Sequence, residues 1–360
     1  MTSVLVAIGS YTEPAYGGSG GGSLGGIHLL RLVRTDHSLH PEAVIACPPN
    51  PSFLVRHDRY LYAVHELKTW RGQFGGAASA FRLDPATGHP VLLNTVPTHG
   101  TDPCHLCVTP DGRHLLVANY SSGHLTVLPI LADGSLGDAI QVIAHEGSSV
   151  HPTRQTSPHV HHVSTDARGA IVHAVDLGTD QIHTYRRDAV TGQLTSADPA
   201  FVSTVPGAGP RQLIRRSHEQ AFIVNELASS ITECRIDAQG AIILGATRST
   251  LPPGHPGPNS CAELCAPPRG DHLYVSNRGL NAIAIFKADT AIGPTLLHNT
   301  PTGGSTPRHF AFSDDNFAVL IANQDSSTVV ALLADPTSGA LGPAAGGRHV
   351  GSPSCVLFLP

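Results

Sequence analysis

Pro103-Cys104-His105-Leu106 opens a short apolar segment, and segments built in the same way recur along the whole chain. Successive copies begin about 50 residues apart, and most begin with proline. The seven openings are Pro51-Ser52-Phe53-Leu54, Pro103-Cys104-His105-Leu106, Pro158-His159-Val160-His161, Pro210-Arg211-Gln212-Leu213, Ser260-Cys261-Ala262-Glu263, Pro307-Arg308-His309-Phe310 and Pro353-Ser354-Cys355-Val356. A period of this length, filled with short strand-like runs, is typical of a β-propeller.

A second apolar run follows each opening and ends in a polar residue. Because these runs are continuously apolar, we expect each to form a strand covered on both faces. Six of them are Tyr62-Ala63-Val64-His65-Glu66, Leu116-Val117-Ala118-Asn119-Tyr120, His173-Ala174-Val175-Asp176-Leu177, Phe222-Ile223-Val224-Asn225-Glu226, Tyr274-Val275-Ser276-Asn277-Arg278 and Leu320-Ile321-Ala322-Asn323-Gln324. The seventh opening lies near the C-terminus, and its matching run is the N-terminal Val6-Ala7-Ile8-Gly9-Ser10-Tyr11. We therefore predict that N-terminal strands join the C-terminal strand in the last blade and close the ring.

Further short runs and turn signals complete each unit. The run His124-Leu125-Thr126-Val127-Leu128 predicts a third strand, and the turn Asp133-Gly134-Ser135-Leu136 precedes a short outer strand. The sequence thus predicts an all-β, seven-bladed β-propeller with four-stranded antiparallel blades, formed by residues 1–360 as one domain. The glycine-rich stretch from Gly17 to Gly26 and the proline-rich stretch from Leu251 to Pro258 are expected to be loops.

Composition limits the possible partners and the compartment. The 360-residue chain has a net charge of -5 and no basic stripe, which argues against nucleic acid or an anionic membrane as a partner. Its seven cysteines are an odd number and lack the paired spacing of a zinc site. Since the sequence shows no leader pattern and no apolar stretch of membrane-spanning length, we expect a reduced cytoplasmic protein. We expect it to be a monomer or a weak homodimer.

Two rows of equivalent positions follow the second runs. The first polar position is uniform, which favours a structural task such as capping the turn. Its members are His65, Asn119, Asp176, Asn225, Asn277 and Asn323, with Gly9 in the closing blade. The next position varies strongly, as expected where strands of a propeller meet around a shaped site. Its members are Glu66, Tyr120, Leu177, Glu226, Arg278, Gln324 and Ser10.

The opening strands supply two more rows, aligned on the proline. The position after the proline holds Ser52, Cys104, His159, Arg211, Cys261, Arg308 and Ser354. Two residues further, on the same strand face, stand Leu54, Leu106, His161, Leu213, Glu263, Phe310 and Val356. In this alignment His161 and Glu263 interrupt an apolar layer. The unusual polar residues cluster in three consecutive blades, which predicts an off-centre site.

Structural interpretations of the same residues stay open. Arg308 could be a solvated surface group, and Arg211, Glu226 and Arg278 could form an internal salt-bridge ring. His159 and His161 share a strand face in this alignment and could bind a metal, although no third ligand stands at informative spacing.

Several motifs together resemble one family. They are Ile8-Gly9-Ser10-Tyr11-Thr12, Asn50-Pro51-Ser52-Phe53-Leu54, Val117-Ala118-Asn119-Tyr120, Ser157-Pro158-His159-Val160-His161, Asp176-Leu177-Gly178-Thr179-Asp180, Gly207-Ala208-Gly209-Pro210-Arg211 and Val224-Asn225-Glu226-Leu227. In this order they are similar to the cyclic lactonase family of seven-bladed propellers, which includes propeller-type 6-phosphogluconolactonases and the carboxymuconate-lactonizing enzyme. The resemblance covers nearly the whole chain.

The resemblance implies a catalytic set of one histidine, two arginines and one glutamate. His161 matches the histidine best, with His159 beside it, while the other members match Arg211, Glu226 and Arg278. The chain departs from the family pattern at two positions. Gln212 stands where histidine is common after Gly-Pro-Arg, and His65 stands where asparagine is usual before the glutamate. Both departures indicate a shifted substrate preference.

This set suits lactone hydrolysis without a metal or an organic cofactor. Arg211 and Arg278 would stabilise the negative charge that grows on the carbonyl oxygen. Glu226 and His161 would serve as acid and base in either order. We expect His159, Arg308, Glu66 and His105 to contact a small anionic lactone, with guanidinium groups on its phosphate or carboxylate.

Three functions follow in order of preference. The first is hydrolysis of 6-phosphogluconolactone or a related sugar lactone. The second is a cycloisomerase that closes a muconate-type dicarboxylate. The third is a binding propeller without catalysis, against which stands the clustering of His, Arg and Glu in place of aromatic hot spots.

Overall fold

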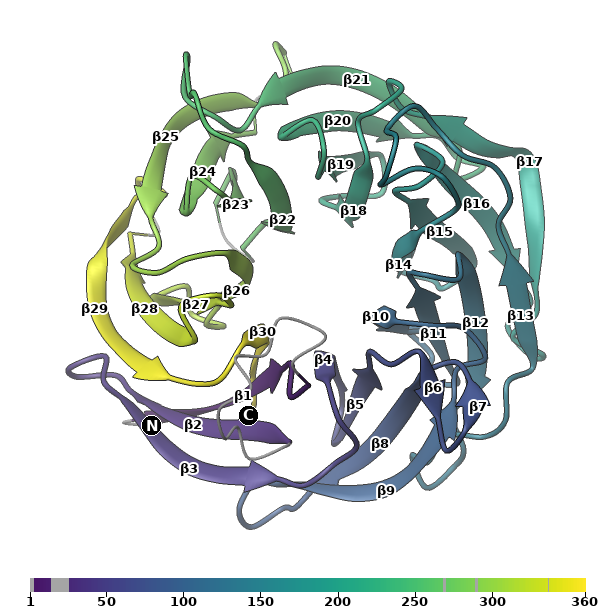
Figure 1. Ribbon diagram of the computed structural model, residues 1–360, viewed down its shortest axis with the longest axis horizontal. Helices are drawn as coiled ribbons and strands as arrows, with labels where there is room; N and C mark the ends of the chain where they lie inside the picture. The colour runs from purple at the N-terminus through teal and green to yellow at the C-terminus, as the bar shows by residue number, and fades with distance from the viewer. Residues whose placement is uncertain (1–2, 14–25, 268–269, 289–290, 336) are drawn as a thin grey trace.

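The chain folds as a ring of β-sheets around a central channel in the computed structural model (Figure 1). The structure describes residues 3–13, 26–267, 270–288, 291–335 and 337–360. Their strands form seven four-stranded antiparallel sheets and one two-stranded hairpin. The predicted seven-bladed β-propeller is thereby confirmed.

Each blade runs from an inner strand at the channel to an outer strand at the circumference. Blade 1 contains β4 (Pro51–His57), β5 (Tyr60–His65), β8 (Ala77–Leu83) and β9 (Pro90–Pro97). Blade 2 contains β10 (Pro103–Val108), β11 (His114–Asn119), β12 (His124–Pro129) and β13 (Gln141–Ala144). Blade 3 contains β14 (Val160–Thr165), β15 (Ile171–Asp176), β16 (Gln181–Arg187) and β17 (Leu194–Ser203). Blade 4 contains β18 (Pro210–Arg215), β19 (Gln220–Asn225), β20 (Ser230–Ile236) and β21 (Ile242–Ser249). Blade 5 contains β22 (Ser260–Cys265), β23 (His272–Arg278), β24 (Ala282–Lys287) and β25 (Thr295–Pro301). Blade 6 contains β26 (Pro307–Phe312), β27 (Ala318–Asn323), β28 (Thr328–Ala334) and β29 (Leu341–His349).

Blade 7 closes the ring with both ends of the chain. It consists of β30 (Pro353–Phe358), β1 (Ser3–Ser10), β2 (Ile27–Val33) and β3 (Leu39–Ile45). The C-terminal β30 is its inner strand and pairs antiparallel with β1, so that Ile8 faces Val356. The predicted closure by N-terminal strands is confirmed. It joins the two ends of the chain in one sheet and so completes the ring of seven blades.

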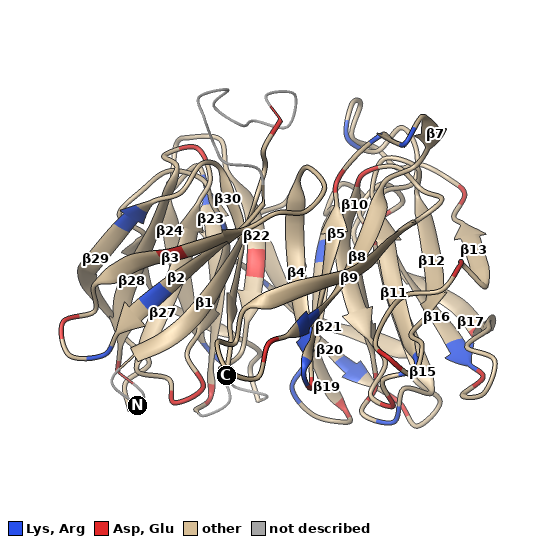
Figure 2. Cartoon of the chain, turned by 90° about the horizontal axis from the view of Figure 1, so that it is seen from below, with Lys and Arg blue, Asp and Glu red and all other residues tan. Residues whose placement is uncertain are grey.

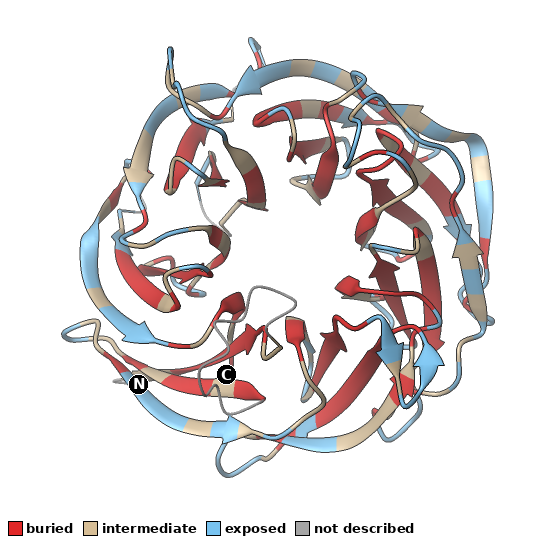
Figure 3. Ribbon diagram, viewed as in Figure 1, coloured by how far each residue is buried: buried red, intermediate tan, exposed pale blue. Residues whose placement is uncertain are grey.

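The apolar core lies between neighbouring blades, where the second and third strands are buried on both faces (Figure 3). Ile8 packs with Leu320 and Val356 in one such cluster between blades 6 and 7. The outer strands are largely exposed on their outer face, as Figure 3 shows. No helix long and apolar enough to cross a membrane occurs in the described part of the chain.

Loops of different length rise from the two ends of the blades. The hairpin of β6 (Thr69–Trp70) and β7 (Gln73–Phe74) connects β5 to β8 and projects from one face of the ring (Figure 2). The stretch from Leu251 to Pro258 connects β21 to β22, as predicted. The predicted loop from Gly17 to Gly26 lies outside the described residues except at Gly26. Charged residues of both signs are scattered over the blades in the view of Figure 2.

An irregularity near the start of each inner strand shapes the channel. In all seven blades the pairing register of the inner strand shifts within its first few residues. A bulge of this kind re-aims side chains and lets two consecutive residues turn the same way. The residue before the strand often has a positive φ, as at Asn50, Asp102 and Gly209, which suits Asn, Asp and Gly. The sequence pattern Asn/Asp/Gly-Pro therefore marks the entry to the channel.

Candidate active site

The bulges define two rings of side chains around the channel and correct the sequence alignment. Val160 pairs with Asp176 as Pro103 pairs with Asn119, so Val160 and not Pro158 begins the equivalent strand. The first ring, one residue after this position, consists of Ser52, Cys104, His161, Arg211, Ala262, Arg308 and Ser354. The alignment had placed His159 and Cys261 in this row. It was wrong in blades 3 and 5, where no proline marks the strand start.

The second ring follows directly after the first. Its members are Phe53, His105, His162, Gln212, Glu263, His309 and Cys355. The next position is the buried layer Leu54, Leu106, Val163, Leu213, Leu264, Phe310 and Val356. This layer is uniformly apolar, so the predicted interruption by His161 and Glu263 is wrong. Both residues face the channel instead.

The ends of the second strands supply a third set of side chains above these rings. Here the corrected register replaces Ser10 by Tyr11, because Ser10 pairs with Pro353 as Asn119 pairs with Pro103. We call this set the strand-end row: Tyr11, Glu66, Tyr120, Leu177, Glu226, Arg278 and Gln324. The uniform position before it has the predicted structural task. Asn119, for example, donates from Nδ2 to the Thr126 hydroxyl at 3.0 Å and to the His124 carbonyl at 3.1 Å.

The first ring and the strand-end row enclose a cavity of about 290 Å³. The cavity is lined by Glu66, Cys104, Tyr120, Arg154, His161, Arg211, Glu226, Arg278 and Arg308. These residues come from blades 1, 2, 4, 5 and 6, and from blade 3 with the loop before it. The cavity therefore lies at the axis, and the expected off-centre site within three blades is corrected. Among its described lining residues, four arginines face two glutamates, which gives a local positive charge in an acidic protein.

Glu226 is the hub of the cavity. Its Oε2 lies 2.7 Å from Arg211 Nη1 and 2.8 Å from Arg278 Nη2, while its Oε1 lies 2.6 Å from Arg154 Nη2. The side chain is only 2% exposed. Burial alone raises the pKa of this carboxyl, but the guanidinium groups of the three arginines hold it well below its usual range. Glu226 is therefore a fixed anion between three cations.

His161 and Arg211 form a contact beside this hub. Arg211 Nη1 donates to His161 Nε2 at 2.5 Å, and Arg211 Nε donates to the Ala262 carbonyl at 3.1 Å. Burial and the Arg211 charge lower the pKa of His161 well below its ordinary value. The imidazole is thus neutral at pH 7, with the lone pair of Nε2 directed at Arg211 Nη1.

Arg278 is held less completely. Its Nη2 donates to the Cys261 carbonyl at 2.9 Å and pairs with Glu226, but its buried Nε has no hydrogen-bond partner among the described residues. Burial lowers the pKa of Arg278 to about 10, which still leaves it charged at pH 7. This guanidinium is therefore less completely hydrogen-bonded than that of Arg211, whose Nε has a carbonyl partner.

Tyr11, Glu66 and Arg308 form a second polar group across the cavity. The Tyr11 hydroxyl donates to Glu66 Oε2 at 2.7 Å, and the Arg308 guanidinium lies 5.1 Å from the centre of the Tyr11 ring. Burial raises the pKa of Glu66, while Tyr11 and Glu66 raise that of Arg308 against the effect of its own burial. The Arg308 charge thus has a local partner of its own. Arg308 lines the cavity, where it was expected to contact a substrate, so the alternative of a solvated surface group does not hold.

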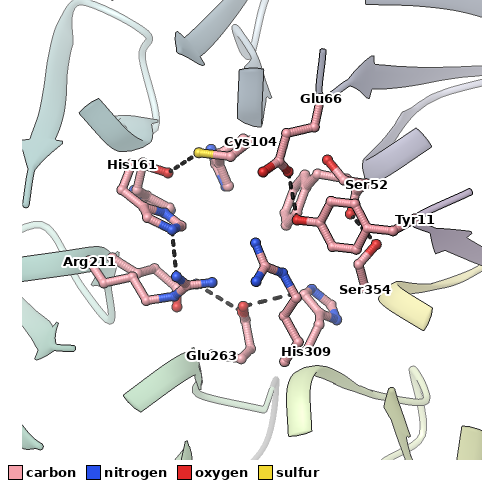
Figure 4. Close-up of a pocket in the computed structure, with 14 residues that line it drawn as sticks. Tyr11, Ser52, Glu66, Cys104, His161, Arg211, Glu263, His309 and Ser354 are labelled. Atoms are coloured by element: carbon pink, nitrogen blue, oxygen red, sulfur yellow. Dashed lines mark hydrogen bonds and ion pairs between the residues drawn. The ribbon is translucent and has the colours of Figure 1, made fainter. Parts of the chain in front are cut away.

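A smaller space of about 20 Å³ lies along the channel where the first and second rings meet, large enough for a water molecule. Figure 4 shows that side chains from strands all around the channel, including His161, Glu263 and His309, point into it. Glu263 accepts a hydrogen bond from Gln212 Nε2 at 2.8 Å, and its Oε2 lies 3.8 Å from His309 Nε2. Burial raises the pKa of Glu263 to about 7. This buried carboxyl is therefore near half-ionised at neutral pH.

The structure places His159 and His105 differently from the other predicted residues. His159 lies outside both cavities, where its ring stacks on Tyr120 at 4.4 Å and its Nδ1 contacts the Tyr120 carbonyl at 3.0 Å. His105 lines the smaller space, and its ring is tilted against that of His162 with the ring centres 4.0 Å apart. The larger cavity thus contains His161, Arg211, Glu226, Arg278, Arg308 and Glu66, but neither of these two histidines.

A metal site at His159 and His161 has no support in the geometry. His161 Nε2 accepts from Arg211, and the two histidines belong to different levels of the channel wall. Among the described residues, the one group with metal-like spacing is His145, Asp176 and His183. Both nitrogens of His145 already have protein partners there, in Asp176 at 2.8 Å and the Tyr185 hydroxyl at 2.9 Å.

Arg154 is the cavity residue that the sequence did not indicate. It lies in the loop between β13 and β14, which is longer than the corresponding loop of the other blades. Its Nη2 bridges Glu226 and the Tyr120 hydroxyl, 3.1 Å away. Tyr120 stood in the variable row, but its partner could not be found from the repeat.

Comparisons with known proteins agree with this architecture. The family model described as "Lactonase, 7-bladed beta-propeller" matches residues 5–358. A 6-phosphogluconolactonase of Bacillus subtilis is 28% identical over 100% of this chain and 99% of its own. Among solved structures, the periplasmic gluconolactonase PpgL of Pseudomonas aeruginosa is 35% identical with a TM-score of 0.91, covering 99% of both chains. A putative 6-phosphogluconolactonase of Bacteroides fragilis is 31% identical with a TM-score of 0.89, covering 100% of this chain and 98% of that one. The axial channel, the repeated blade pattern and these matches lead to one conclusion: the chain belongs to the lactonase family of seven-bladed β-propellers.

Proposed function

We propose that the protein hydrolyses a sugar lactone, with 6-phosphogluconolactone as the preferred substrate. The observation that carries this proposal is the buried Glu226, which three guanidinium groups hold next to the neutral His161. Such a site offers a base, fixed donors and a positive field to an anionic ester. The names of the relatives support the same class of substrate, since they refer to 6-phosphogluconolactone or gluconolactone.

The residues divide the chemistry as follows. A water molecule attacks the ring carbonyl while His161 Nε2 takes its proton, and the electron pair of the carbonyl moves to its oxygen. Arg211 and Arg278 donate to this oxyanion, which lowers the barrier because their positions are fixed before the reaction. The ring C–O bond then breaks, and the imidazolium of His161 returns the proton to the leaving alkoxide. The product is a hydroxy acid.

Glu226 serves mainly to position the donors in this scheme. Guanidinium groups already occupy both of its carboxylate oxygens, whereas His161 Nε2 is unprotonated and contacts only Arg211 Nη1. Arg211 Nη1 must turn from His161 toward the substrate for His161 to act, and an anionic ligand supplies the attraction for that rotation. This assignment differs from both orders that the sequence left open, because His161 serves as base and then as acid, and Glu226 serves as neither.

A lactone panel tests the proposal. Hydrolysis of 6-phosphogluconolactone and gluconolactone can be followed by acid release in weakly buffered solution, against the spontaneous rate. We expect acceleration with at least one lactone. Mixing the protein with a carboxymuconate and following the ultraviolet absorbance of the diene tests the cycloisomerase alternative. Loss of the diene without lactone hydrolysis would replace our proposal by that alternative, and inactivity in both assays would favour the binding propeller.

The cytoplasmic location and the monomeric or weakly dimeric state remain predictions. The solved relative in Pseudomonas aeruginosa is described as periplasmic, so the compartment of this protein needs its own test. Cell fractionation and light scattering on the purified protein test the two predictions directly.

A further inference from the structure

Arg154 reaches over the mouth of the cavity from outside the blades. Its side chain is 39% exposed, compared with 9% for Arg211 and 14% for Arg278. Its Nη2 group contacts Glu226 Oε1 at 2.6 Å and the Tyr120 hydroxyl at 3.1 Å. Arg154 is therefore the guanidinium that an entering molecule meets first among the three around Glu226.

The loop that carries Arg154 is anchored on both sides. The His151 amide donates to Gln155 Oε1 at 3.0 Å, and Gln155 Nε2 donates to the Leu177 carbonyl at 2.9 Å. Ser149 Oγ donates to Asp180 Oδ2 at 2.6 Å. Asp180 also accepts from the amides of Gly207 and Gly209, which lie before β18. The position of Arg154 is thus built into the fold, while its side chain stays accessible.

The charges around Glu226 do not balance. Three guanidinium groups share a single carboxylate, so this side of the cavity has a surplus of positive charge. Arg308, on the other side, makes none of these ion pairs with Glu226 and instead lies 5.1 Å from the centre of the Tyr11 ring, whose hydroxyl donates to Glu66. Arg211 and Arg278 lie deeper and are directed at the reacting carbonyl in the proposed mechanism. The surplus that remains for a second anionic group is therefore at Arg154.

We propose that Arg154 binds the phosphate monoester of the substrate and determines the preference for a phosphorylated over an unphosphorylated lactone. The Tyr120 hydroxyl beside it offers a second hydrogen bond to the same group. When the phosphate arrives, Arg154 exchanges Glu226 for the substrate, and Glu226 keeps Arg211 and Arg278 in place. This inference rests on the proposed lactonase function and names the residue that recognises the anionic end of the substrate.

Kinetics with two substrates test the proposal. We compare wild type, Arg154→Gln and Arg154→Lys on 6-phosphogluconolactone and on gluconolactone. Losing the charged contact should raise KM for the phosphorylated lactone about 10- to 100-fold in Arg154→Gln. The ratio of kcat/KM for the phosphorylated lactone to kcat/KM for gluconolactone should therefore fall about 10- to 100-fold, because gluconolactone has no phosphate to lose. The KM of Arg154→Lys for the phosphorylated lactone should lie between those of wild type and Arg154→Gln, since lysine keeps the charge but lacks the planar guanidinium group.

Arg168→Gln is the matched control. Arg168 is an exposed arginine in the turn between β14 and β15 and lines neither channel cavity, so its loss removes the same charge without touching the site. An equal loss on both lactones in Arg154→Gln would assign Arg154 to holding Glu226 and would overturn the proposal. Unchanged kinetics on both lactones would overturn it as well.

Titration calorimetry with inorganic phosphate separates this inference from the proposed function. Wild type should bind phosphate at least about tenfold more tightly than Arg154→Gln, whether or not either lactone is hydrolysed. If wild type hydrolyses neither lactone, the proposed function fails, and the calorimetry still decides whether Arg154 is a phosphate ligand. Equal phosphate affinity in the two proteins would contradict our inference.

Discussion

Replacing Glu226 by glutamine should destabilise the protein and remove its activity together. The carboxylate makes three ion pairs between 2.6 and 2.8 Å and is 2% exposed. Removing one partner of a buried ion pair costs about 3 to 5 kcal/mol, because the remaining charges lose their compensation. In Glu226→Gln, three guanidinium groups would face a neutral amide.

The expected change in melting temperature follows from the size of the chain. With an unfolding entropy of roughly 2.1 cal/mol/K per residue, the 360 residues give about 0.75 kcal/mol/K. A loss of about 3 to 5 kcal/mol then lowers Tm by about 4 to 7 °C. We expect kcat/KM for the lactone to fall by about 100-fold or more, because Arg211 and Arg278 lose the group that positions them.

Added phosphate should rescue the stability of this variant. Its anion can take the vacated position between the guanidinium groups, so phosphate should raise Tm more in Glu226→Gln than in wild type. Differential scanning calorimetry with and without phosphate measures both effects, and lactone kinetics measure the activity. Glu219→Gln removes an exposed carboxylate elsewhere and should shift Tm by less than about 1 °C. Wild-type Tm and activity in Glu226→Gln would refute the central position of this carboxylate.

Three further predictions concern pH and packing. Burial lowers the pKa of His162 from 6.5 to about 3. Between these two pH values the imidazole binds a proton in the unfolded chain but not in the folded chain, so acid favours unfolding. Tm should fall as the pH drops from 7 to 5, and the fall should be shallower in His162→Gln than in wild type. Burial raises the pKa of Glu263 to about 7, so its favourable contribution is lost as the pH rises through 7. Glu263→Gln should therefore raise Tm at pH 8 more than at pH 5.5, and equal shifts would contradict the raised pKa. Ile8→Ala, at the fully buried blade closure, should lower the free energy of unfolding by about 2 to 5 kcal/mol in a urea titration. The exposed Val190→Ala should change it by less than about 0.5 kcal/mol, and similar losses in both would argue against the closure as a packing site.

The architecture could be predicted from sequence because it depends on local, repeated signals. Apolar runs such as Leu116-Val117-Ala118 mark strands that are buried on both faces, and a period near 50 residues marks the blades. Closure by β1 and β30 followed from the one incomplete unit at each end of the chain. These signals need no knowledge of side-chain contacts.

The register of the inner strands could not be predicted reliably, since a bulge leaves no pattern of its own. Proline marks the strand start in five blades, but Val160 and Cys261 take that place in blades 3 and 5. A shift of one or two residues exchanges channel and core positions. For this reason the alignment put His159 in the ring to which His161 belongs.

Residues outside the repeat were also beyond sequence reasoning. Arg154 belongs to a loop of one blade only, and its contact with Glu226 joins positions 72 apart in sequence. Periodicity compares equivalent positions, so it cannot find a residue that has none. Its role follows only from the distances in the folded chain.

The most direct test of the account is the rate of ring opening of 6-phosphogluconolactone by chelator-treated wild type and by Arg211→Ala. We predict that wild type accelerates hydrolysis well above the spontaneous rate with or without chelator. Arg211→Ala should lose most of this acceleration, because it removes both the oxyanion donor and the contact to His161. A spontaneous rate with wild type, or full activity in Arg211→Ala, would contradict lactone hydrolysis by this site.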